Sequence, residues 1–328
     1  MSRPRASVII RCYNEREHIG RLLYGVYEQT VEDIEVLLVD SGSTDGTLEV
    51  ARQYPIDDVV YVSPDEFSFG RALNYGVDTA DGEFCVFASA HVYPTRKDWL
   101  ERLLETFEEE IALVYGKQRG DDRTKFPEKR VFRRWFPDHD IERQTTPFCN
   151  NANAAIRRSV WEDHRYDESL PGLEDLDWAK RVREDGWEIS YASDAEIVHV
   201  HEETARQVYN RYRREAIAHR EIMEDDSFTV LDCCRLFASN TVADYRAALR
   251  EGELPGSLLE IPRFRLMQFL GTWRGFNQEV PVSDRLRQRF FYPDTRGYPE
   301  GTEEETDRDL RIDYSERDGS IDYTPFED

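Results

Sequence analysis

Residues 36–47 read Val-Leu-Leu-Val-Asp-Ser-Gly-Ser-Thr-Asp-Gly-Thr, and this stretch decides the fold. Its apolar half is typical of a buried strand, expected over 34–39 and ending at Asp40. Small polar residues follow over 41–46, and a helix is expected from about Thr47. Taken alone, the polar part is an ordinary turn before a helix. A buried strand that leads through a short loop into a helix is, however, the unit from which parallel α/β sheets are built.

The same alternation of strand and helix extends on both sides of this stretch. Strands are expected over 6–11, 59–62, 84–88 and 113–115 and near 189 and 197, with helices near 19–26, 70–79, 95–109 and 177–183. We predict a Rossmann-like α/β domain with a mostly parallel central sheet covered on both faces. Ligands of such sheets bind at the carboxyl ends of the strands, which here are the loops 11–15, 40–45 and 89–91.

The remainder of the chain divides into regions of different composition. Residues 120–148 are irregular, basic and aromatic, and regular patterning then resumes within a domain that spans 1–205. Helices are expected at about 204–224, 233–250 and 258–276, so that 206–298 forms a helical C-terminal extension. The tail over 299–328 is acidic and nearly free of apolar clusters, and we expect it to be flexible.

The charge balance excludes general binding of nucleic acid and suggests the kind of organism from which the protein comes. The 328 residues carry 67 Asp and Glu against 43 Lys and Arg, a net charge of −24, which excludes nucleic acid as a general partner. Only five of the basic residues are lysines. Acidic excess with few lysines is typical of a halophilic archaeon, because molar salt shortens the Debye length to about 3 Å. An ordinary acidic protein with a GC-rich coding bias is the alternative.

The cysteines and the hydropathy favour a cytoplasmic location. Five cysteines form no Cys-x-x-Cys pair, so buried free thiols in a reducing compartment are expected. The first residues lead directly into a strand without the apolar region of a signal peptide. No apolar run reaches the roughly 18 residues of a membrane span. The inner face of the membrane is the alternative location.

Three segments together resemble a known family. Residues 7–15 read Ser-Val-Ile-Ile-Arg-Cys-Tyr-Asn-Glu, and with 39–47 they resemble the nucleotide-binding half of family 2 glycosyltransferases, which have the GT-A fold and invert the anomeric centre. The segment 67–74, Phe-Ser-Phe-Gly-Arg-Ala-Leu-Asn, is similar to the third helix of that family. The resemblance covers about 6–205. It implies binding of a nucleoside-diphosphate sugar through Arg11, Tyr13, Asn14, Glu15, Asp40, Ser41, Asp45, Arg71, Asn74, Ser89, Ala90, Asn151 and Asn153.

One motif departs from the family pattern. Where members usually carry Asp-x-Asp to hold the ribose and a divalent cation, this chain has Ser89-Ala90-His91. Some relatives similarly use Asp-x-His with a further histidine. Here His199 and His201 have the spacing that points two side chains of a strand to one side. The resemblance therefore implies a divalent cation, Mn²⁺ or Mg²⁺, at these three histidines. Local hydrogen bonding by the histidines is the alternative.

The second chemical signal is the segment 172–178, Gly-Leu-Glu-Asp-Leu-Asp-Trp. Inverting transfer needs one general base for the acceptor hydroxyl, and by the resemblance this base is Asp175, with Glu174 bound near the acceptor. A helix N-terminus that attracts acidic residues is an equally good local explanation. The amides of 150–153 would read sugar hydroxyls, or would simply form a turn.

These observations predict transfer of a single sugar from a nucleoside-diphosphate sugar to a hydroxyl of a glycan or a lipid-linked glycan. The chain contains neither the Gln-x-x-Arg-Trp motif of processive synthases nor membrane helices. A sugar-nucleotide-binding protein with weak catalysis is the first alternative, because Ser89 replaces Asp. A nucleotidylyltransferase is less favoured, since no glycine-rich loop follows the first strand, and an oxidoreductase lacks its Gly-x-Gly-x-x-Gly. The segment 258–274 mixes Leu, Phe, Trp and Arg, and would pack on the catalytic domain or a second subunit, or contact a membrane.

Overall fold

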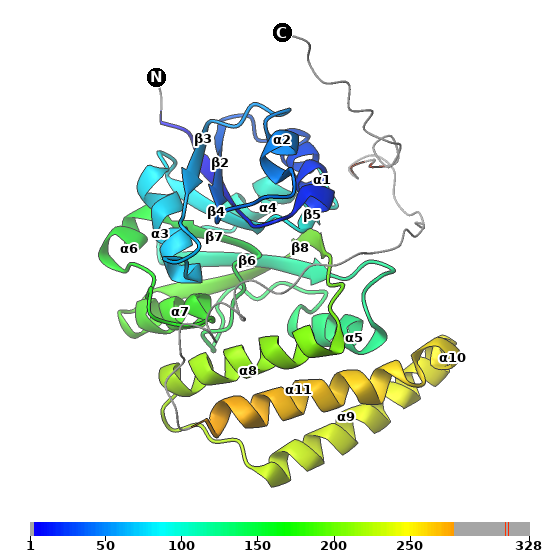
Figure 1. Ribbon diagram of the computed structural model, residues 1–328. Helices are drawn as coiled ribbons and strands as arrows, with labels where there is room; N and C mark the ends of the chain where they lie inside the picture. Colours follow the sequence, from blue (N-terminus) through cyan, green and yellow to red (C-terminus); the bar gives the residue numbers. More distant parts are fainter. Residues whose placement is uncertain (1–2, 279–311, 313, 315–328) are drawn as a thin grey trace.

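The computed structural model describes residues 3–278, together with Ile312 and Tyr314. Its centre is an eight-stranded sheet with the order β3-β2-β1-β4-β7-β6-β8-β5 (Figure 1). The strands are β1 (Ala6–Cys12), β2 (Ile34–Asp40), β3 (Asp58–Tyr61), β4 (Phe84–Ser89), β5 (Val92–Pro94), β6 (Ile111–Arg119), β7 (Asn153–Arg157) and β8 (Glu188–His199). The helices are α1 (Arg16–Tyr27), α2 (Thr47–Ala51), α3 (Phe69–Thr79), α4 (Trp99–Glu105), α5 (Phe126–Trp135), α6 (Arg158–Asp163), α7 (Glu174–Glu184), α8 (Ala205–Ile222), α9 (Val230–Glu251), α10 (Leu254–Ser257) and α11 (Glu260–Phe276).

The sheet is mostly parallel, as the sequence predicts. Strands β3, β2, β1 and β4 pair in parallel, β7 runs antiparallel to both of its neighbours, and β8 returns parallel to β6. The short β5 is antiparallel to β8. The register sets Cys12 opposite Asp40 and Arg11 opposite Ser89, so β1, β2 and β4 end at one edge. The three predicted ligand-binding loops therefore lie together.

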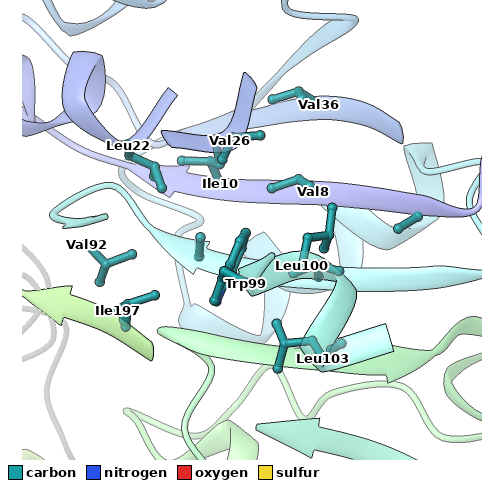
Figure 2. Close-up of a cluster of buried hydrophobic side chains, with 14 of the residues drawn as sticks. Val8, Ile10, Leu22, Val26, Val36, Val92, Trp99, Leu100, Leu103 and Ile197 are labelled. Atoms are coloured by element: carbon teal, nitrogen blue, oxygen red, sulfur yellow. The ribbon is translucent and has the colours of Figure 1, made fainter. Parts of the chain in front are cut away.

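Alternating side chains of the strands fill two separate cores. Ile10 faces the helices α1, α2 and α4, where Leu22 and Trp99 pack against it (Figure 2). Ile9 faces the opposite side and packs in a cluster with apolar residues of α3, α6 and α7, among them Trp178. Successive residues of a strand point to opposite faces, so a continuously apolar strand requires this double cover.

Two segments differ from the sequence-based expectation. The region 120–148 contains α5, whose Pro127 occupies the first turn, where a missing N–H is tolerated. Phe126 and Phe132 are buried on this helix, but the basic residues between and after them hide the apolar pattern in the sequence. The helix expected over 95–109 is shorter: α4 spans Trp99–Glu105, and a turn over 95–98 separates it from β5.

The C-terminal helices lie side by side beneath the sheet, with α11 between α8 and α9 (Figure 1). Gly271 permits this approach: a Cβ there would lie 2.5 Å from the carbonyl oxygen of Tyr209 on α8. No helix of the described part has the length and apolar character needed to cross a bilayer. The predicted flexible tail lies outside the described residues, apart from Ile312 and Tyr314. Both are buried, and the Tyr314 hydroxyl donates to the carbonyl oxygen of Pro94 at 2.8 Å.

Candidate functional site

A cavity of about 830 Å³ lies at the carboxyl edge of the sheet. Its walls come from the loops after β1, β2 and β4, from the start of α7, from the end of β8 and from one side of α8. This is the place that the sheet topology predicts for a ligand, and the volume lies within the range of small-molecule and cofactor pockets.

The first two loops are held together by their own polar side chains. Asn14 has a left-handed backbone (φ 54°), a conformation that Asn adopts more readily than most residues. Its Oδ1 accepts from the backbone N–H of Thr44 at 2.8 Å, and its N–H donates to Ser43 Oγ at 2.9 Å. Asp45 accepts from the backbone N–H of Arg16 at 3.1 Å, at the start of α1. The turn and the Asn-Glu segment thus form one rigid edge of the cavity.

Most of the predicted donor-binding residues line this cavity. They are Arg11, Tyr13, Asn14, Glu15, Ser41, Asp45, Ser89 and Asn151. Five others, Asp40, Arg71, Asn74, Ala90 and Asn153, are not among its lining residues.

Four of those five residues bond through their side chains to other parts of the protein. Asp40 accepts from the backbone N–H groups of its own loop, including that of Gly42 at 3.0 Å. Asn74 and Asn153 are buried, and their amides bond to neighbouring groups that include the indole N–H groups of two tryptophans. Arg71 pairs with Glu168 at 2.7 Å. These side chains lie outside the lining of the cavity and bond to other parts of the protein.

The three predicted histidines converge on one point of the cavity. One ring nitrogen from each of His91, His199 and His201 lies within 4.8 Å of the others. The rings of His199 and His201 are 4.0 Å apart between centroids, which confirms that both side chains point to one side.

Each histidine is oriented through its Nδ1 atom by an acceptor. The acceptors are Glu15 Oε1 for His91 (2.7 Å), Gln118 Oε1 for His199 (2.8 Å) and Glu128 Oε1 for His201 (2.7 Å). Gln118 Nε2 donates to Asn150 Oδ1, which fixes the direction of the Gln118 amide. Histidines that donate from Nδ1 to such acceptors present the lone pair of Nε2, and this is how proteins prepare imidazoles as metal ligands.

Glu128 joins the histidines to the helical extension. Its side chain is 1% exposed and contacts both His201 and the guanidinium of Arg211 on α8. Burial alone would raise the pKa of Glu128, but Arg211 and His201 lower it to about 2. Burial lowers the pKa of His199 well below its usual value, with further lowering by the charges of His201, His91 and Arg211. The cluster thus combines a fixed carboxylate with a neutral imidazole.

The acidic pair opens α7 at the opposite side of the cavity. Leu173 before it has a left-handed backbone (φ 55°), which turns Glu174 and Asp175 inward. Asp175 accepts from the backbone N–H of Leu176 at 2.8 Å and from that of Asn151 at 3.2 Å. Burial raises the pKa of Asp175 to about 7, and the adjacent charge of Glu174 adds to the effect.

Glu174 is itself paired with a cation from the first strand. Its Oε1 lies 3.2 Å from a guanidinium nitrogen of Arg11, whose guanidinium carbon sits 5.2 Å from the centre of the Phe69 ring. The two acids therefore differ: Glu174 forms an ion pair with Arg11, whereas Asp175 has a proton affinity suited to exchange near neutral pH.

Comparison with known proteins agrees with this arrangement. The model of glycosyl transferase family 2 matches residues 7–165. An O-antigen chain rhamnosyltransferase of Salmonella anatum is 28% identical over 66% of this chain and 72% of its own. A glycosyltransferase of Haloferax volcanii (AglE) is 30% identical over 58% of this chain and 65% of its own.

Residues 7–165 form a family 2 glycosyltransferase domain. The fold agrees with that of a mannosyltransferase from Pyrobaculum calidifontis solved with GDP-Man and Mn²⁺, at a TM-score of 0.58 and 21% identity over 85% of this chain and 89% of that one. The family match over residues 7–165 and the relatives named as glycosyltransferases indicate that this chain transfers sugars.

Sequence reasoning missed part of the glycosyltransferase cavity. The α8 wall carries Gln207, Asn210, Arg211 and Arg214, whose spacing of 3, 1 and 3 residues places them on one side of the helix. That polar stripe was the available signal. Gln118 and Glu128 gave no signal of their own.

Proposed function

We propose that this glycosyltransferase moves one sugar, with inversion at the anomeric carbon, from a nucleoside-diphosphate sugar to a hydroxyl of a glycan or lipid-linked glycan. The observation that carries the proposal is the state of Asp175. It lines the cavity, it is fixed by two backbone N–H groups, and its pKa is raised by burial to about 7. A carboxylate with these properties is suited to accept the proton of an attacking hydroxyl.

The proposed reaction is a single displacement at the anomeric carbon. The acceptor oxygen forms a bond to the anomeric carbon while the bond from that carbon to the diphosphate oxygen breaks. The hydroxyl proton passes to Asp175, and the nucleoside diphosphate leaves with the electron pair. Glu174, held by Arg11, is positioned to bind the acceptor without competing for that proton.

The histidine cluster fits a divalent cation. The three Nδ1 atoms are held by acceptors. The Nε2 atoms of His91, His199 and His201, with their lone pairs, would therefore hold the ion. Such an ion would neutralise charge on the departing diphosphate. Imidazole ligands favour Mn²⁺ over Mg²⁺, which prefers oxygen.

The halophilic source of the protein stays a prediction.

The test is a screen of UDP, GDP and dTDP sugars for hydrolysis and transfer in high KCl, for the wild type and for Asp175→Asn. The proposal expects release of nucleoside diphosphate, a loss of rate of about 10²–10⁴-fold in the variant, and nucleotide binding that changes only a few-fold. Binding without turnover by the wild type would favour the sugar-nucleotide-binding alternative. Release of pyrophosphate would favour a nucleotidylyltransferase.

A further inference from the structure

Exposed apolar side chains are concentrated on the helical extension. Of the ten large apolar residues that are exposed in the described part, seven lie between residues 230 and 266. We define the outer helical face by six of them: Leu231, Val242, Leu249, Leu258, Leu259 and Leu266. Leu249 is 68% exposed and Leu259 is 81% exposed. Single exposed leucines are ordinary, but such a concentration on one layer marks an interaction surface.

The exposed residues of α9 form a stripe with a basic margin. Leu231, Ala238, Val242 and Leu249 are separated by 7, 4 and 7 residues, so they share one side of the helix. Arg235 and Arg246 lie beside this stripe and are exposed. The opposite side of α9, with Asp244, Ala247 and Ala248, is buried against the rest of the protein. The helix thus carries apolar residues on both sides, and those of its outer side are exposed.

α11 continues the same pattern. Leu259, Arg263, Leu266 and Arg274 recur at intervals of 4, 3 and 8 residues, and all four are exposed. Leucine and arginine thus alternate along the outer side of this helix.

The charge of this region differs from that of the whole chain. Between residues 230 and 276 there are six arginines and five carboxylates, in a chain with 67 acidic and 43 basic residues. Two of these carboxylates point inward, as does the buried Arg265. Asp244 is buried between Arg130 and Arg265, and Glu260 accepts from the backbone N–H of Phe126 at 2.8 Å. The outer helical face is consequently apolar and basic, while the chain as a whole is strongly acidic.

We propose that the outer helical face docks on an anionic lipid surface. Its leucines would enter the interface and its arginines would bind headgroup phosphates, a combination typical of helices that lie on membranes. The arginines and the anionic lipid have opposite charge, whereas a two-fold contact with the same face of a second copy would set arginines against arginines, so charge favours the lipid. One side of α8 lines the cavity and α11 packs against α8 (Figure 1). With helices about 10 Å thick, the cavity would lie roughly 20 Å from the lipid surface.

The test is flotation of the full chain with vesicles of phosphatidylcholine, with and without half phosphatidylglycerol. We expect the wild type to float only with the anionic vesicles. The double substitution Leu249→Gln with Leu259→Gln should weaken binding at least about tenfold, since both side chains are already exposed and their loss leaves the fold intact. Arg246→Gln with Arg263→Gln should remove the preference for anionic lipid. Tyr61→Ser with Tyr75→Ser, two exposed apolar residues of the nucleotide-binding half, is the matched control and should bind as the wild type does.

The proposal is overturned if the wild type does not float, or if the leucine variant floats as well as the wild type. Self-association that the leucine substitutions abolish, without flotation, would instead make this face an interface between copies. Flotation requires no donor sugar, so its outcome is separate from that of the transfer assay.

Discussion

The Nε2 atoms of His199 and His201 lie 2.9 Å apart, while the Nδ1 atom of each ring is held by a different side chain. Gln118 can only accept through its Oε1, and Glu128 is an acceptor as a carboxylate, so both Nδ1 atoms are donors. Two Nε2 lone pairs at this separation repel each other unless a proton or a cation lies between them. The arrangement is therefore suited to hold positive charge at this point of the cavity.

We first predict that Mn²⁺ raises the transfer rate and that His91→Ala weakens Mn²⁺ binding at least about tenfold. The reason is that the ligand set loses one of three converging imidazoles. Calorimetric titration with Mn²⁺ and transfer assays with and without EDTA provide the measurement. His219→Ala, which removes a partly exposed histidine paired with Asp226, is the matched control and should bind Mn²⁺ as the wild type does. Full activity in EDTA, with His91→Ala unaffected, would remove the cation from the proposal.

A second prediction concerns Glu128, which positions His201. Glu128→Gln keeps the shape and an acceptor oxygen but removes the charge that faces both His201 and Arg211. We expect Mn²⁺ affinity to fall about 10–100-fold and the thermal midpoint to fall as well, because Arg211 loses a buried partner. Glu251→Gln, which breaks the exposed ion pair between α9 and Arg133 of α5, should change neither by much. Equal Mn²⁺ affinity for Glu128→Gln and the wild type would show that Glu128 is only structural.

The histidine cluster shows what sequence can and cannot predict about this site. His91 follows a strand in a recognisable motif, and the interval between His199 and His201 fixes a common side, so their convergence could be predicted. Gln118 and Glu128 could not be predicted, because their role arises from contacts over more than 70 residues of sequence.

The fold was predicted where local pattern decides it. Strands such as β1 and β2 are continuously apolar, and their parallel pairing follows from the helix between them. The antiparallel direction of β7 was not predicted, because no local pattern sets the direction of a strand that follows a long irregular segment. The role of Asp40 toward a nucleotide stays a prediction, and local pattern did not predict that its carboxylate accepts the N–H groups of Gly42 and Ser43. Such local hydrogen bonding is common for Asp in turns.

A third prediction is that transfer depends on ionised Asp175. Since its pKa is raised to about 7 in the free protein, kcat/KM for the acceptor should rise about tenfold per pH unit below 7 and level off above it. Glu174→Gln removes a neighbouring negative charge that raises the pKa of Asp175, so the midpoint of this profile should move to lower pH. A profile that is flat from pH 5 to 8, or a midpoint that moves upward in Glu174→Gln, would contradict the assignment of Asp175 as the base.

The last prediction uses Asp175 as a probe of stability. Because burial raises its folded-state pKa from an ordinary value near 3.8 to about 7, the folded protein holds a proton between these pH values that the unfolded chain has released. The contribution of Asp175 to the free energy of unfolding should therefore fall as pH rises from about 4 to 7, and this loss is complete above about 7. Asp175→Asn does not titrate, so its stability relative to the wild type should rise by up to about 4 kcal/mol across that window.

The quantity to measure is the pH dependence of the stability difference between Asp175→Asn and the wild type. An amide at residue 175 cannot accept both backbone N–H groups, and the loss of stability that this causes is the same at every pH. Urea unfolding at intervals from pH 4 to 9, for both proteins at one salt concentration, gives the difference directly. Asp232→Asn supplies a control without a pH trend in this range. Hydrogen bonds from Thr229 lower the pKa of Asp232 below 3.8, so the stability of this variant relative to the wild type changes only below about pH 4 and should stay constant from pH 4 to 9. A constant difference between Asp175→Asn and the wild type over the whole range would mean that Asp175 is ionised in the folded protein throughout, and that it does not take up a proton near neutral pH.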